Sequence, residues 1–154
     1  MRKVRVLNGP NLDLLGVREP EIYGKQSLED IHKRLENEAR GYKIDLDFFQ
    51  SNYEGELIEK IHEAFKSKYD GIIINPGAFT HYSYAIRDAI SGVRIPTIEL
   101  HLSNIYTREE FRSKSVIAPV CIGQISGLGV DSYSLALFAL FNRFNSQTSE
   151  EGLK

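Results

Sequence analysis

A tyrosine and an arginine close together in a short polar loop are the residues of this sequence that most suggest catalysis. Arg18 and Tyr23 lie between Gly16 and Gly24, shortly after a strand-like segment at the N-terminus. A free tyrosine has a pKa of about 10 and is a poor base at neutral pH. A nearby guanidinium favours the phenolate, and arginine stays charged at any working pH. The pair suggests a tyrosine base, and the plainer alternative is a solvated arginine beside a packed tyrosine ring.

A second titratable pair has the spacing of neighbours on one face of a strand. Glu99 and His101 are two residues apart in an apolar segment, so on a β-strand both side chains point the same way. Glu99 can orient or charge His101, and a histidine that titrates near neutrality suits a general acid or base. A purely structural hydrogen bond between the two explains the spacing equally well.

Two polar loops offer groups that can hold an anionic or hydroxyl-rich ligand. Asn75 to His81 is a glycine-containing turn that leads into a helix, where free backbone N–H groups suit a carboxylate. Alternatively, Thr80 is a plain N-cap and His81 a surface residue. Ser103 follows the fourth predicted strand, and Arg112 can face the same space. For a single arginine, a solvated surface charge is the competing interpretation.

Other reactive side chains favour structural roles. Cys121 lies in an apolar stretch, which indicates a buried thiol and not a nucleophile. The four histidines lack metal-site spacing, and we expect His32 and His62 at the surface, so no metal site is predicted. No lysine follows a predicted strand, and Lys25 and Lys114 are the nearest loop candidates. A Schiff-base mechanism therefore has no obvious carrier.

Strand-like and helix-like patterns alternate along the chain. Strands are expected near residues 4–8, 44–48, 71–75, 95–100 and 116–121, and helices near 28–35, 57–65, 82–91, 107–112 and 131–144. Ser27 is an N-cap candidate with Asp30 three residues later. Pro119 places the fifth strand at a sheet edge. The segment Gly123 to Gly129 does not have phosphate-loop spacing and is interpreted as a turn into the final helix.

This alternation predicts an α/β protein with a flavodoxin-like, three-layer fold and a five-stranded parallel sheet. Ligands of such sheets bind outside the carboxyl ends of the strands. Asn8, Asn75 and Glu99 with His101 end the first, third and fourth predicted strands. These polar residues should therefore converge at one edge of the sheet, which is the strongest argument from the residues for a site.

The composition is that of an ordinary globular domain. With 154 residues, 42% of them hydrophobic, and a net charge of −2, we expect one catalytic domain over residues 1–144 and a disordered tail over 145–154. Nothing in the charge pattern suggests binding to nucleic acid or a membrane. No apolar run approaches the roughly 20 residues of a membrane span. A cytoplasmic location is expected by default.

Several long motifs, in order, resemble the signature of type II 3-dehydroquinate dehydratases. The resemblance extends from about Val4 to the final helix, and Asp13 departs from the asparagine that is common in this family. It is carried by Leu7–Gly16, Arg18–Gly24, Gln50–Asn52, Asn75–Ala78, His81, Ala85–Asp88, Glu99–Asn104 and Phe111–Arg112.

The resemblance implies dehydration of 3-dehydroquinate to 3-dehydroshikimate in the shikimate pathway of aromatic amino acid biosynthesis. The expected route is anti elimination through an enolate, without Schiff base, metal or cofactor. By position, Tyr23 is the base that takes the C2 proton, and Arg18 keeps it ionisable. Asn8 helps to hold a water that stabilises the enolate. His101 is the acid that protonates the leaving C1 hydroxyl, with Glu99 in support.

The same resemblance implies a substrate-binding set and an oligomer. The expected subunit assembly is a homododecamer built from trimers, in which Asp88 reaches a neighbouring subunit's site. The residues expected to bind substrate are Asn75, Gly77, Ala78, His81, Asp88, Leu102, Ser103 and Arg112.

A non-catalytic flavodoxin-like module, either a flavin carrier or a response-regulator receiver, is the competing class. A receiver needs an acidic residue at the end of the first strand and a lysine near the end of the fifth. Here the first strand ends in Asn8, and the predicted fifth strand leads to Ile122. A flavin carrier needs a Ser/Thr-rich phosphate loop after the first strand, where this chain has Gly9 to Leu12.

Overall fold

Five parallel strands form one sheet in the computed structural model, which describes residues 1–152. The strands run in the order β2-β1-β3-β4-β5, and every neighbouring pair is parallel. This is the predicted flavodoxin-like order. The strands are β1 (Arg2–Asn8), β2 (Ile44–Gln50), β3 (Gly71–Asn75), β4 (Thr97–His101) and β5 (Gly123–Ser126).

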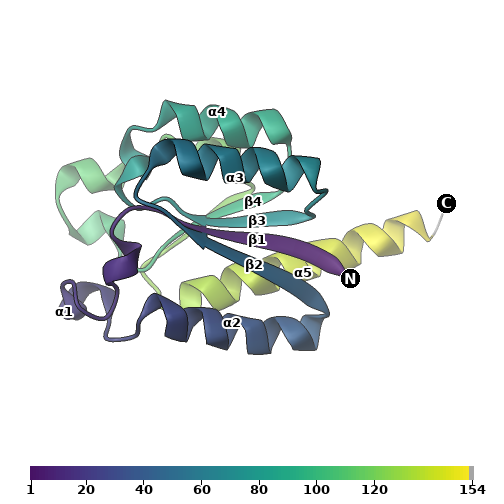
Figure 1. Cartoon of the computed structure of the whole chain (residues 1–154), viewed down its shortest axis with the longest axis horizontal. Coiled ribbons are helices and arrows are strands. Elements are labelled where there is room, and N and C mark those ends of the chain that lie inside the picture. The colour runs from purple at the N-terminus through teal and green to yellow at the C-terminus, as the bar shows by residue number, and fades with distance from the viewer. Residues whose placement is uncertain (153–154) are drawn as a thin grey trace.

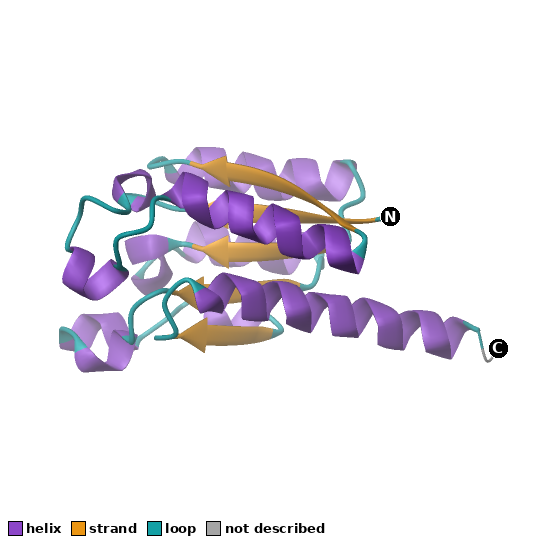
Figure 2. Ribbon diagram, turned by 90° about the horizontal axis from the view of Figure 1, so that it is seen from below, coloured by secondary structure: helices purple, strands orange, loops and turns teal. Residues whose placement is uncertain are grey.

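Helices cover both faces of the sheet, as Figure 1 shows: α3 and α4 lie on one face, and α2 and α5 lie on the other. The strand arrowheads that are visible in Figure 2 all point toward the same end of the molecule. No helix in the described part of the chain has the length and hydropathy of a membrane span. The helices are α1 (Pro20–Tyr23), α2 (Leu28–Tyr42), α3 (Glu54–Lys66), α4 (Tyr84–Val93) and α5 (Asp131–Glu151).

The core has two apolar layers, one on each side of the sheet. Ile73 packs with the layer under α2 and α5, whereas Ile72 and Ile74 pack with the layer under α3 and α4. All of β3 is buried, because a central parallel strand is covered on both faces. The predicted capping box of Ser27 and Asp30 is also present, and it begins α2 above this core.

The strand register brings the polar strand ends together. Asn8 at the end of β1 pairs with Asn75 at the end of β3. Glu99 in β4 pairs with Gln124 in β5. Because the strands are parallel, these side chains reach the same edge of the sheet.

The prediction of the fifth strand was wrong in its residues, although its place at the edge was right. The segment 116–121 contains a 3-10 turn at Ala118–Val120, and β5 begins only at Gly123. Val116 and Ile117 are apolar because they are buried in the layer under α3 and α4, and Pro119 has no N–H for a ladder. β5 is partly exposed, so it lacks the apolar pattern of a central strand. The turn that was predicted to begin at Gly123 was therefore wrong, because Gly123–Ser126 is this strand.

Two helix predictions also need correction. The segment 107–112 forms two 3-10 turns, Ile105–Thr107 and Glu110–Ser113, in place of one helix. The expected tail is helical as far as Glu151, and residues 153–154 lie outside the described part. Hydroxyl groups of the tail donate to backbone carbonyls four residues earlier, such as Ser146 to Asn142 and Thr148 to Phe144. These side chains therefore form hydrogen bonds that are compatible with the helical backbone.

Candidate active site

A cavity lies at the carboxyl ends of the strands, where the polar strand ends converge. It encloses about 600 Å³ of empty space, including its open side. Most of the residues predicted to bind or transform a ligand line it, but Asn8, Asp88 and Glu99 do not. The lining residues are Pro10, Asn11, Leu12, Arg18, Tyr23, Asn75, Gly77, Ala78, His81, His101, Leu102, Ser103, Ile105, Arg108 and Arg112.

Tyr23 has two guanidinium groups near its ring. The Cζ atom of Arg18 lies 4.9 Å from the ring centroid, and that of Arg108 lies 5.1 Å from it. Arg108 also donates a hydrogen bond to Ser103 Oγ at 3.3 Å. The structure therefore brings the predicted pair together and adds Arg108, which the sequence analysis missed.

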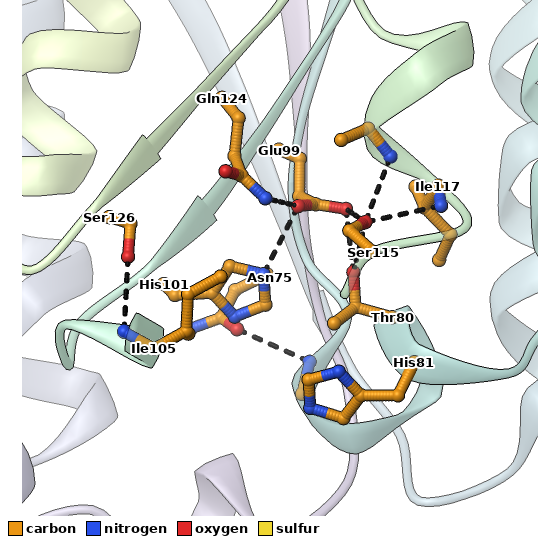
Figure 3. A network of polar contacts seen from close by, with 12 residues as sticks. Asn75, Thr80, His81, Glu99, His101, Ile105, Ser115, Ile117, Gln124 and Ser126 are labelled. Atoms are coloured by element: carbon orange, nitrogen blue, oxygen red, sulfur yellow. Dashed lines mark hydrogen bonds and ion pairs between the residues drawn. The ribbon is translucent and has the colours of Figure 1, made fainter. Parts of the chain in front are cut away.

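His101 and Glu99 form the second pair. His101 Nε2 lies 3.2 Å from Glu99 Oε2, and both side chains are buried. Figure 3 shows three further donors around the same carboxylate, from Thr80, Ser115 and Gln124. Burial alone would raise the pKa of Glu99, but the hydrogen bond and charge of His101, together with Gln124 and Thr80, lower it overall. Glu99 is thus a stable anion behind His101.

The turn after β3 is held by close backbone contacts. Gly77 has φ +57, and a side chain there would meet the Pro10 carbonyl oxygen at 3.1 Å. His81 Nδ1 lies 2.7 Å from the Lys114 carbonyl oxygen, and burial lowers its pKa. Thr80 is not a helix cap: Ser83 caps α4, and the Thr80 hydroxyl bonds to the buried carboxylate described above.

Asn8 lies behind the cavity and not in it. It is fully buried, accepts a hydrogen bond from Tyr133 Oη at 2.5 Å, and places its amide nitrogen 3.4 Å from His32 Nε2. Asn75 donates to the same phenol at 3.2 Å. His32, which was expected at the surface, is half-buried, because α2 packs this ring against Phe48 of β2 with 4.0 Å between centroids.

Asp88 is exposed on α4. Cys121 is half-buried, and burial raises its pKa to about 12, so its thiol is not a nucleophile at neutral pH. Among the described residues, no group of three or more His, Cys, Asp or Glu side chains could hold a metal ion.

Three supporting residues were missed for identifiable reasons. Arg108 precedes Arg112 in the same polar segment. A second arginine in this segment was the feature of the sequence that could have indicated its place in the site. Ser115 and Gln124 were overlooked because the fifth strand was placed too early in the chain. Gln124 pairs with Glu99 in the register of β4 and β5, and Ser115 reaches the same carboxylate from the loop before β5.

One cavity therefore contains a candidate base and a candidate acid. Tyr23 with its two arginines can take a proton, and His101 backed by Glu99 can donate one. Such a pair suits an elimination in which a carbon acid loses a proton and a hydroxyl leaves as water.

Comparisons with known proteins point to one family. The family model described as dehydroquinase class II matches residues 2–141. A 3-dehydroquinate dehydratase of Caldicellulosiruptor bescii is 63% identical over 140 residues, which are 91% of this chain and 97% of that protein. One of Clostridium perfringens is 57% identical over 145 residues, 94% of this chain and 99% of that one. The crystal structure of a type II dehydroquinase from Butyrivibrio crossotus has a TM-score of 0.89 at 49% identity, covering 90% of this chain and 97% of that one.

Proposed function

The chain belongs to the class II dehydroquinase family, and from this premise we propose that it dehydrates 3-dehydroquinate to 3-dehydroshikimate by elimination through an enolate. As a member of this family, the chain is a type II 3-dehydroquinate dehydratase of the shikimate pathway. The roles of individual residues are our proposal, and the observation that carries it is the placement of Tyr23 and His101 in one cavity.

Proton abstraction comes first in the proposed mechanism. The Tyr23 phenolate takes a proton from C2, beside the C3 ketone, and the C–H electron pair moves into an enolate. The positive charges of Arg18 and Arg108 favour the phenolate before this step. An α-proton of a ketone is acidic enough for such a base only if the enolate oxygen is stabilised. Asn8 is buried behind the cavity, so its proposed contribution to enolate binding is indirect, through the side chains around it.

Loss of the hydroxyl completes the reaction. The enolate electrons form the C1–C2 double bond, the C1–O bond breaks, and His101 supplies the proton that lets the oxygen leave as water. Glu99 stabilises the charged imidazole. We propose that the substrate carboxylate and hydroxyls are held by Asn75, Gly77, Ala78, His81, Leu102, Ser103 and Arg112, all of which line the cavity.

No lysine is among the residues that line the cavity, and this supports a route without an imine. A Schiff-base mechanism needs an amine within reach of the C3 ketone. Borohydride added with substrate should therefore leave every lysine unmodified by mass spectrometry.

The direct test is the ultraviolet absorbance of the conjugated enone that 3-dehydroquinate yields. Purified protein should produce this absorbance with 3-dehydroquinate but not with the analogue whose C3 ketone is reduced to an alcohol, because that compound cannot form an enolate. If the purified protein is colourless and forms the enone, the flavin-carrier alternative is excluded. Absence of enone formation by folded protein would contradict the proposed function.

A further inference from the structure

The carboxylate of Glu99 accepts hydrogen bonds from four side chains (Figure 3). Oε1 receives the hydroxyls of Thr80 at 2.6 Å and Ser115 at 2.7 Å. Oε2 receives His101 Nε2 at 3.2 Å and the amide nitrogen of Gln124. A carboxylate has about four acceptor positions, and here all of them are used.

The direction of the bonds at Oε1 is fixed by two backbone groups. The N–H groups of Ile117 and Ala118 donate to Ser115 Oγ at 3.2 and 2.9 Å. A hydroxyl has one hydrogen and two acceptor positions, so Ser115 must donate its hydrogen and cannot accept a third. Thr80, 2.9 Å from Ser115, therefore has to donate to Glu99.

This arrangement stabilises the ionised form of Glu99. A protonated Oε1 would meet Thr80 and Ser115 as competing donors, whereas a charged Oε1 accepts from both. With Glu99 as an acceptor, His101 must carry a hydrogen on Nε2, and its Nδ1 is the nitrogen left for the cavity. The tautomer of His101 thus follows from hydroxyl groups that do not line the cavity.

We propose that Thr80 and Ser115 are positioning residues of the elimination: by donating to Glu99 they keep its carboxylate ionised and aimed at His101. This inference rests on the proposed function, in which His101 is the acid. Thr80 belongs to the 3-10 turn Gly77–His81, and its carbonyl accepts from Val116 N at 2.8 Å. The same contacts therefore tie two loops of the cavity to the acid.

The sign of the expected pH effect follows from the charge of Glu99. Removing a donor from an anion raises the proton affinity of the coupled pair that Glu99 forms with His101. The pair then keeps its proton to higher pH, so the high-pH limb of the kcat profile moves upward. The low-pH limb, which reports the base, serves as an internal reference because its group is unchanged.

The matched variants are Thr80→Val, which removes the hydroxyl but keeps the shape, and Thr80→Ser, which keeps the hydroxyl. We expect Thr80→Val to lower kcat by about 10- to 100-fold with KM unchanged, and to move the high-pH limb up by about one pH unit. Thr80→Ser should restore the wild-type profile. Ser115→Ala should act like Thr80→Val. Ser113→Ala should have no effect, since Ser113 is exposed and its hydroxyl donates to the Glu110 carbonyl, away from Glu99.

A Glu99→Gln background separates positioning from simple structural damage. If Thr80 acts through Glu99, Thr80→Val should add no further loss in that background. An equal loss in both backgrounds, or a high-pH limb that does not move, would overturn the inference. If Thr80→Val does not fold, Ser115→Ala, at a half-buried position, tests the inference by the same two measurements: the loss in the Glu99→Gln background and the shift of the high-pH limb. Failure of the wild type to make the enone would refute the proposed function, whereas unaffected variants of an active wild type would refute only this inference.

Discussion

The guanidinium carbon of Arg108 lies 5.1 Å from the centroid of the Tyr23 ring. Arg18, from the same loop as Tyr23, lies 4.9 Å from that centroid. Arg108 comes from a different segment, between the 3-10 turns that follow β4, and Ser103 Oγ accepts its hydrogen bond at 3.3 Å. The surroundings of the candidate base therefore depend on contacts between distant parts of the chain.

Arg108→Ala should reduce kcat by about 10²-fold, the lower end of the range for loss of general-base catalysis, because one of two cations that favour the phenolate is lost. Arg108→Lys should recover part of this loss, since lysine keeps the charge but not the planar group. Steady-state kinetics with 3-dehydroquinate measure both. Arg40→Ala, on the exposed side of α2, is the control. Wild-type kcat in Arg108→Ala would show that Arg108 does not assist Tyr23.

The loop from Leu14 to Gly24 should be mobile without ligand and should close over substrate. Gly16 and Gly24 both have positive φ and flank the segment, Val17 is 82% exposed, and α1 has no buried residue. Few apolar anchors allow local opening at low cost. Trypsin cleavage after Arg18 should slow when a substrate analogue binds, while cleavage after Lys68, in the exposed turn that follows α3, should not change. Equal cleavage at Arg18 with and without the analogue would contradict lid closure.

Much of this site was accessible from the sequence because parallel strands end at one edge. Asn75, Glu99 and His101 each lie at the end of a strand with a clear apolar pattern, so their convergence could be predicted. The hydrogen bonds to Glu99 from Thr80, Ser115 and Gln124 could not be predicted in the same way. Gln124, for example, lies in a partly exposed edge strand without an apolar pattern. The partial burial of His32 depends on how α2 packs on β2, which local periodicity does not determine.

We expect a homo-oligomer, a dodecamer built from trimers, whose active site includes Asp88 of a neighbouring subunit. Asp88 is exposed on α4 and does not line its own cavity. Leu135 and Phe138 of α5 are 42% and 46% exposed, which suits burial in subunit contacts. Light scattering should give a mass many times 17.5 kDa.

Mixed oligomers test the shared site directly. Asp88→Ala and Tyr23→Phe should each be nearly inactive alone, whereas co-expressed subunits should regain activity. A site with an intact Tyr23 can then receive an intact Asp88 from its neighbour. Asp45→Ala, on the exposed part of β2, should stay active alone. A fully active monomer, or no recovery in mixed oligomers, would contradict the shared site.

Stability should fall as the pH is lowered from about neutrality. Burial lowers the pKa of His32 and His81 below the ordinary 6.5, so the unfolded state binds more protons than the folded state below that value. The loss should begin near pH 6.5 and be complete below the folded-state values. The pKa of Glu99 is also lowered from 4.5, so its stabilising contribution is lost at still lower pH.

Thermal unfolding at fixed protein concentration across this pH range measures the effect. His32→Gln keeps an acceptor for Asn8 but cannot be protonated, so it should flatten the dependence near pH 6.5 relative to the wild type. A dependence that is the same in His32→Gln and wild type would exclude His32 as a source of the acid sensitivity.

The measurement that tests the central claim most directly is enone formation by Tyr23→Phe. This substitution removes only the phenol oxygen, so the fold and substrate binding should remain. We predict a kcat at least about 10²- to 10⁴-fold below the wild type, with an unchanged circular dichroism spectrum and retained binding of a substrate analogue. Near-normal turnover of 3-dehydroquinate by Tyr23→Phe would contradict the assignment of Tyr23 as the base, and with it the proposed mechanism.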